Sequence, residues 1–179
     1  MKNVLIVLTT LFFALPMMAQ RTSERPSAMV QGPRQVVKTS PLALAFGNFN
    51  ASYERVISSS SSVNLSANYQ YRLFGVDVNA LGLGAGWRYY FTHAKKPVPA
   101  GFYVQPQAGV SFGNVGDANY TRMGFGAEVG YQWVWESGFV LDLGVGPQYS
   151  VLSGEIDDID FDSDGGIGPS ATLAIGYAF

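Results

Sequence analysis

The densest group of candidate ligand atoms in this 179-residue sequence is an acidic segment near its C-terminus. Six of the thirteen Asp and Glu residues lie in residues 155–164, and no Lys or Arg follows residue 153. The carboxylates of Asp158, Asp160, Asp162 and Asp164 alternate along the chain ahead of Gly165, as they do in the first half of a calcium-binding loop. The twelfth position, counted from Asp160, is Ala171 and not a bidentate Glu. We favour a solvated acidic loop, and a weak divalent-cation site that bridges to lipid phosphates is the alternative.

The single histidine gives little support for an enzyme. His93 lies beside Lys95 and Lys96, and neither a metal site nor acid–base catalysis has a second histidine to use. The sequence contains no cysteine, which excludes disulfides, thiolate metal sites and a lipidated N-terminal cysteine. We therefore predict that the protein is not an enzyme and has no cofactor, with weak calcium binding in the acidic loop as the alternative.

Five further charged residues share one property, which is that each occupies the polar side of an alternating segment. They are Glu54, Arg72, Arg88, Glu128 and Asp142. If that side is enclosed, the charges have to pair, because an unpaired buried charge costs several kcal/mol. We expect Arg88 to bond Glu54 or Glu128, with Asp142 nearby.

The elements that position these charges are predicted to be strands. Apolar and polar residues alternate in segments 63–72, 102–112, 123–135, 139–151 and 173–179, and less regularly in 38–46, 50–57 and 76–91. Such a period of two places apolar side chains on one face of a strand. Most of these segments reach the roughly ten residues that a tilted strand needs to cross a bilayer.

Composition favours a membrane setting for these eight strands. Charged residues make up 13% of the chain, whereas an ordinary soluble domain has about 25%. Beyond the first residues no segment is long and apolar enough for a spanning helix. A closed barrel is the other structure in which every backbone N–H and C=O group finds a hydrogen-bond partner within lipid. The predicted fold is all-β, an eight-stranded antiparallel up-and-down transmembrane β-barrel.

The N-terminus carries the features of an export signal. Lys2 precedes an apolar run over residues 4–15, and Met17-Met18-Ala19 resembles a cleavage site. We predict a signal peptide over residues 1–19, a flexible periplasmic extension over 20–36 and the barrel over 37–179.

An even number of strands places both termini on the periplasmic side. Turns 58–62, 92–100 and 136–138 then face the periplasm, and 113–122 and 153–168 face outward, although turn 92–100 is long for its side. Val63, Leu65, Val129, Leu141 and Leu143 should face lipid. The five charges face the lumen, where we expect them to form a plug together with Gln105, Gln107, Gln132 and Gln148; a gated pore or proton path is the alternative.

The last seven residues, Leu173-Ala-Ile-Gly-Tyr-Ala-Phe179, complete this pattern with a C-terminal phenylalanine. In this and in its architecture the chain resembles the small outer-membrane β-barrel families of the OmpA transmembrane domain, OmpX and OmpW. The resemblance implies a bacterial outer-membrane location. It also implies that Leu173, Ile175, Tyr177 and Phe179 form the signal that the barrel-insertion machinery recognises.

The function predicted from these features is that of a non-enzymatic outer-membrane barrel with a plugged, ion-paired lumen that serves envelope integrity or surface interaction. One alternative is a narrow porin-like channel or transporter for small or hydrophobic solutes, and a second is a soluble, secreted, lipocalin-like binder. We expect a monomer whose partners are outer-membrane lipids and the insertion machinery. The formal net charge of −2 gives no basic field for nucleic acid.

Overall fold

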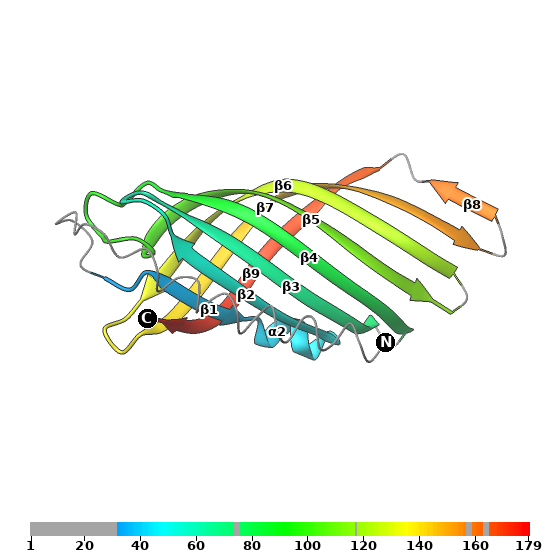
Figure 1. The fold of residues 1–179 in the computed structure, drawn as a ribbon, viewed down its shortest axis with the longest axis horizontal. Helices are drawn as coiled ribbons and strands as arrows, with labels where there is room; N and C mark the ends of the chain where they lie inside the picture. The colour runs from blue at the N-terminus through cyan, green and yellow to red at the C-terminus, as the bar shows by residue number, and fades with distance from the viewer. Residues whose placement is uncertain (1–31, 74–75, 117, 157–158, 163–164) are drawn as a thin grey trace, which may run out of the picture.

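The alternating segments form long strands in the computed structural model, which describes residues 32–73, 76–116, 118–156, 159–162 and 165–179 (Figure 1). The elements are β1 (Gln35–Thr39), α2 (Pro41–Ala45), β2 (Asn48–Val56), β3 (Ser61–Leu73), β4 (Val76–Tyr90), β5 (Gly101–Val115), β6 (Ala118–Val134), β7 (Phe139–Ile156), β8 (Ile159–Asp162) and β9 (Gly166–Ala178).

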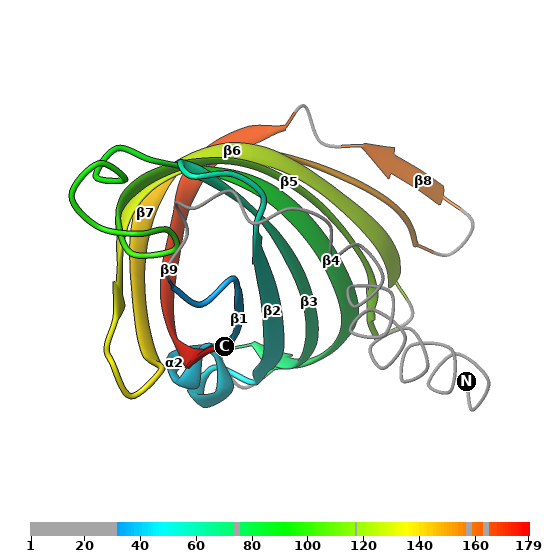
Figure 2. The same ribbon diagram turned by 60° about the vertical axis from the view of Figure 1, so that its left-hand side comes forward.

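Antiparallel pairing closes these strands into a ring. Neighbours from β1 to β7 pair in sequence order, β7 pairs with β9, and β9 returns to β1 with Tyr177 opposite Val37. The backbone N–H of Phe179 donates to the carbonyl oxygen of Gln35 at 2.9 Å, which joins the start of the first barrel strand to the C-terminus. Strand β8 pairs with the end of β7 and stands outside the ring (Figure 2). The predicted eight-stranded antiparallel up-and-down barrel is confirmed.

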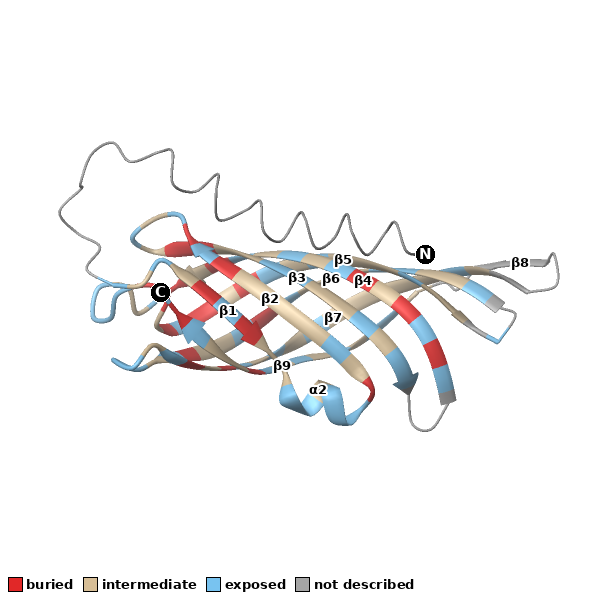
Figure 3. Cartoon of the chain, turned by 60° about the horizontal axis from the view of Figure 1, so that its bottom comes forward, coloured by how far each residue is buried: buried red, intermediate tan, exposed pale blue. Residues whose placement is uncertain are grey.

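Adjacent residues point to opposite sides of the wall. Glu128 is 2% exposed, whereas the next residue, Val129, is 59% exposed. Asp142 is buried and Leu143 is exposed, as the alternation predicts. The buried positions concentrate toward the end of the barrel where the C-terminus lies (Figure 3). The sequence period therefore produces a polar interior and an apolar exterior.

The first predicted strand, residues 38–46, is wrong over most of its length. Strand β1 ends at Thr39 and the helix α2 follows. The Ser40 hydroxyl accepts a hydrogen bond from the Ala43 N–H at 3.3 Å, and Pro41 occupies the first turn of the helix. A serine N-cap followed by proline is a strong local signal for a helix start, and here it outweighs the alternation.

The outer connection predicted over residues 153–168 is also partly strand. β7 continues to Ile156, and β8 pairs with it so that Asp160 lies opposite Glu155. At the other end of the chain, the barrel begins at Gln35, two residues before the predicted boundary. The predicted signal peptide, residues 1–19, and most of the predicted extension lie outside the described residues. In the part of the chain that is described, no helix combines the length and hydrophobicity needed to cross a membrane.

Candidate functional site in the barrel lumen

One end of the lumen is covered by the connection between β4 and β5, residues 91–100. It lies at the same end as the C-terminus (Figure 1). Val98 is 2% exposed and packs with Val56, Tyr90 and Tyr103, while the Pro99 carbonyl accepts a hydrogen bond from Gln132 Nε2 at 2.7 Å. These contacts explain why this turn is longer than its side of the barrel would suggest, since its second half folds over the opening.

On the lumen side of this cover lies a cluster centred on Lys38. Lys38 belongs to β1, and its side chain points into the lumen. Its Nζ donates to Glu54 Oε2 at 2.7 Å, to Gln132 Oε1 at 2.8 Å and to Asp142 Oδ2 at 2.7 Å. An ammonium group has three donors. All three are used, and the residue is 2% exposed.

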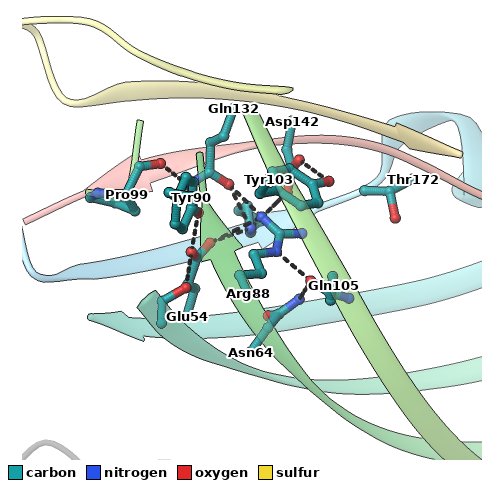
Figure 4. A network of polar contacts seen from close by, with 12 residues as sticks. Glu54, Asn64, Arg88, Tyr90, Pro99, Tyr103, Gln105, Gln132, Asp142 and Thr172 are labelled. Carbon is teal, nitrogen blue, oxygen red and sulfur yellow. Dashed lines mark hydrogen bonds and ion pairs between the residues drawn. The ribbon is translucent and has the colours of Figure 1, made fainter. Parts of the chain in front are cut away.

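Arg88 on β4 is the second cation of the cluster (Figure 4). Its Nη1 lies 3.2 Å from Glu54 Oε2 and 2.8 Å from Asp142 Oδ2. Its Nε donates to Gln105 Oε1, and its guanidinium carbon lies 4.0 Å from the centroid of the Tyr103 ring. Arginine suits this position because its planar fork can bond several acceptors and stack on an aromatic face.

The two carboxylates receive further hydrogen bonds from neutral side chains. Glu54 Oε1 accepts from Ser62 Oγ at 2.6 Å and from the Tyr90 hydroxyl, and Asp142 Oδ1 accepts from the Tyr103 hydroxyl at 2.8 Å. Two cations thus face two carboxylates, so the cluster has no formal net charge. A buried ion cluster is stable only when its remaining hydrogen-bonding capacity is also satisfied, and these hydroxyls supply it.

Glu128 is buried but lies apart from the two cations. Its Oε1 accepts from Gln107 Nε2 at 3.1 Å and from Ser170 Oγ, and its Oε2 accepts from Thr172 Oγ1 at 2.8 Å. Among the described contacts Arg88 therefore pairs with Glu54 and Asp142, and not with Glu128.

Arg72 does not belong to the lumen cluster, contrary to its predicted place there. Its Nε lies 3.6 Å from Asp77 Oδ1 near the other end of the barrel, and both side chains are largely exposed. Lys38 takes the role that was assigned to Arg72. Counting charges in the sequence does not separate the two residues, because either Arg72 or Lys38 would supply the second cation that Glu54 and Asp142 require beside Arg88.

The cluster of Lys38, Arg88, Glu54, Asp142 and Gln132, called the plug below, fills only one half of the lumen. Gln148 and the other inward glutamines were expected to help close the whole lumen. In the other half a cavity of about 660 Å³ remains, lined by Gln148, Gln70 and Asn68 among others. The cluster thus lies at one end of this cavity, which is called the cup below.

The remaining predicted residues are those of the acidic segment, His93 and the C-terminal stripe. Asp158 and Asp164 fall outside the described residues, while Asp160 and Asp162 are in β8, opposite Glu155 and Ser153. Among the described residues no three His, Cys, Asp or Glu side chains are grouped so as to hold a metal ion. His93 Nδ1 lies 2.7 Å from the Tyr90 carbonyl oxygen. Of the C-terminal stripe, Leu173, Tyr177 and Phe179 are exposed and Ile175 is half-buried.

Comparisons with known proteins give a family of unknown function and a structural similarity. The family described as "Protein of unknown function (DUF3575)" matches residues 7–155. No curated protein matches the chain. A solved structure that is similar to it is that of the Yersinia pestis outer membrane protein Ail in a phospholipid bilayer nanodisc. The two share 15% identity with a TM-score of 0.43, over 83% of this chain and 100% of that one.

Proposed function

The chain belongs to the DUF3575 family of proteins of unknown function, and from its architecture we propose that it is a non-enzymatic outer-membrane β-barrel with a closed lumen. In this proposal residues 1–19 are removed on export, and the barrel is inserted as a monomer by machinery that recognises the C-terminal stripe. Its role is to stabilise the envelope or to present its outer hairpins to partners at the surface.

The observation that carries the proposal is the inverted distribution of polarity. Large apolar side chains such as Phe125, Val129 and Met123 are about 60% exposed on the outer wall, whereas Lys38, Glu54 and Asp142 are buried inside. Soluble proteins rarely expose a contiguous apolar surface of this kind. A lipocalin-like binder would show the opposite arrangement, with its apolar side chains inside.

Two further features suit a bilayer. Exposed aromatic residues form one group near the termini and a second group toward the other end, as expected for interfacial girdles; they are Phe91, Phe102, Trp135, Phe139, Tyr177 and Phe179 in the first group and Phe46, Phe49, Tyr69, Tyr71, Phe112 and Phe125 in the second. Strands β3 to β7 are 13 to 18 residues long, more than the roughly 9–11 needed to cross. In this proposal the additional residues of these strands extend beyond the outer surface of the membrane.

The plug supports the proposal of a closed lumen. The cations and carboxylates of the cluster occupy one another, and the cover at Val98 and Pro99 lies beneath them. A solute would have to break these contacts to pass. The arrangement therefore favours a structural role over the channel alternative.

The test combines two measurements on the mature protein. It should require detergent for extraction and migrate as a heat-modifiable band, and in planar bilayers it should show no steady conductance. Arg88→Ala, which removes one of the two cations of the plug, should increase the number of channel openings. Arg72→Ala is the matched control, because Arg72 lies outside the cluster. A protein that stays monomeric in buffer alone would contradict the membrane proposal. Steady conductance that Arg88→Ala leaves unchanged would contradict the closed lumen.

A further inference from the structure

The cup above the plug has the size of a small-molecule site. Its volume of about 660 Å³ lies within the range of roughly 300–1,000 Å³ that such sites occupy. Side chains of β3 lie directly over glycines on the inner face of β4. A Cβ added at Gly82 would lie 2.3 Å from Asn68 Oδ1, and one at Gly84 would lie 2.6 Å from Ser66 Oγ. Polar side chains of β3 thus lean across positions that have no side chain of their own.

The lining of the cup consists largely of neutral hydrogen-bonding groups. The side-chain amides that line it include those of Asn64, Asn68, Gln70, Gln105, Gln107 and Gln148. Among the described lining residues Arg122 alone carries a charge, and its Nη2 donates to Ser150 Oγ at 2.9 Å. An amide both donates and accepts hydrogen bonds, as a hydroxyl does. A cationic ligand would find no carboxylate in this lining to compensate its lost hydration.

The floor of the cup is held in place by the plug, and one buried acceptor beside it has no hydrogen-bond partner. Gln105 accepts from Arg88 Nε and donates to Gln107 Oε1 at 2.5 Å, which fixes both amides. Asn64 Nδ2 lies 3.5 Å from Gln105 Oε1, while Asn64 Oδ1 is buried without a hydrogen-bond partner. A buried acceptor of this kind costs free energy until a donor reaches it.

From these features we propose that the cup binds a neutral polyhydroxylated solute of mono- or disaccharide size, whose hydroxyl groups bond the side-chain amides of the lining. The ligand enters from the end opposite the plug. The inference rests on the geometry of the cup and requires neither membrane insertion nor a closed floor. A binding site goes beyond the proposed function, since a barrel with a purely structural role does not require one.

The test uses the full mature protein in lauryldimethylamine oxide, because a detergent with a maltoside head group would compete for the site. Maltose is the probe, and glucose 6-phosphate and choline are the charged comparisons; binding is measured by isothermal titration calorimetry. We expect saturable binding of maltose. Ser111→Trp fills the cup from its wall and should weaken maltose binding by about tenfold or more. Phe112→Trp, the next residue along β5 and outward-facing, is the matched control and should leave binding unchanged.

A second variant guards against misfolding of the first. Asn68→Leu keeps the volume of the side chain and removes its hydrogen bonds, so it should weaken binding about fivefold, as the loss of one hydrogen bond predicts. Heat-modifiability confirms that each variant is folded. The proposal is overturned if maltose does not bind, if Ser111→Trp and Asn68→Leu leave its affinity unchanged, or if only glucose 6-phosphate binds and Arg122→Gln abolishes that binding.

Discussion

Replacing Lys38 by methionine tests the energetic role of the plug. The substitution keeps an unbranched side chain and removes three hydrogen bonds of 2.7, 2.8 and 2.7 Å from a residue that is 2% exposed. Glu54 and Asp142 are then left with Arg88 alone, so the buried cluster gains one uncompensated negative charge. Removing one partner from a buried ion pair costs about 3–5 kcal/mol, and we expect the free energy of unfolding to fall by that amount.

The assay is reversible urea unfolding in phospholipid vesicles, followed by tryptophan fluorescence. Lys38→Met combined with Asp142→Asn restores a neutral cluster, and the double variant should be less destabilised than the sum of the single ones. Lys96→Met is the matched control, because Lys96 is exposed where it bonds the Tyr131 hydroxyl, and its effect should stay within about 0.5 kcal/mol. If Lys38→Met is as stable as the wild type, or if the two substitutions simply add, the plug is not an electrostatically coupled unit.

Three further outcomes follow from the wall of the barrel. Val129→Arg, on the lipid side, should lower the free energy of unfolding in vesicles by about 2–4 kcal/mol, whereas Ser66→Arg, facing the cup, should cost much less; equal costs would contradict the assigned faces. Deleting Phe179 should reduce the yield of inserted protein at the cell surface far more than Asp160→Asn does, and normal yield would show that insertion does not depend on the terminal residue. Ser40→Ala removes the cap of α2 and should cost about 1 kcal/mol in the same urea assay, while an unchanged midpoint would mean that the helix adds no stability.

Alternation predicted the strands and the direction of most side chains, and the low fraction of charged residues together with the lack of a spanning helix then favoured a barrel. Val129 and Glu128 illustrate why, because a shift of one residue in register would reverse every side chain of the strand, and only one choice keeps the charges out of the apolar exterior. The helix α2 was missed because its signal is local. Ser40 and Pro41 decide the conformation of five residues whose apolar character also suits a strand.

Lys38 could not be placed from the strand pattern for a related reason. Strand β1 has five residues, too few for a period of two to be recognised with its face. Its partners, Glu54 and Asp142, are 16 and 104 residues away in the sequence and meet it only because β1 closes the ring between β2 and β9. The sum of the inward charges does not report this contact either, because it is the same whether Arg72 or Lys38 is the second cation.

The division of the lumen into plug and cup can nevertheless be followed along a single strand. The inward positions of β4 are Gly82, Gly84 and Gly86, then Arg88 and Tyr90. An eight-stranded barrel has an interior just wide enough for side chains to fill. The three inward glycines add no side chain of their own to this space, whereas Arg88 and Tyr90 fill it. The order of small and large residues on the inner face therefore determines which end is open, and the charges determine how the closed end is held together. The inward glycines of β4 therefore shape the cup together with its amides, because the amides of the neighbouring strands can lean inward only where the facing position is empty.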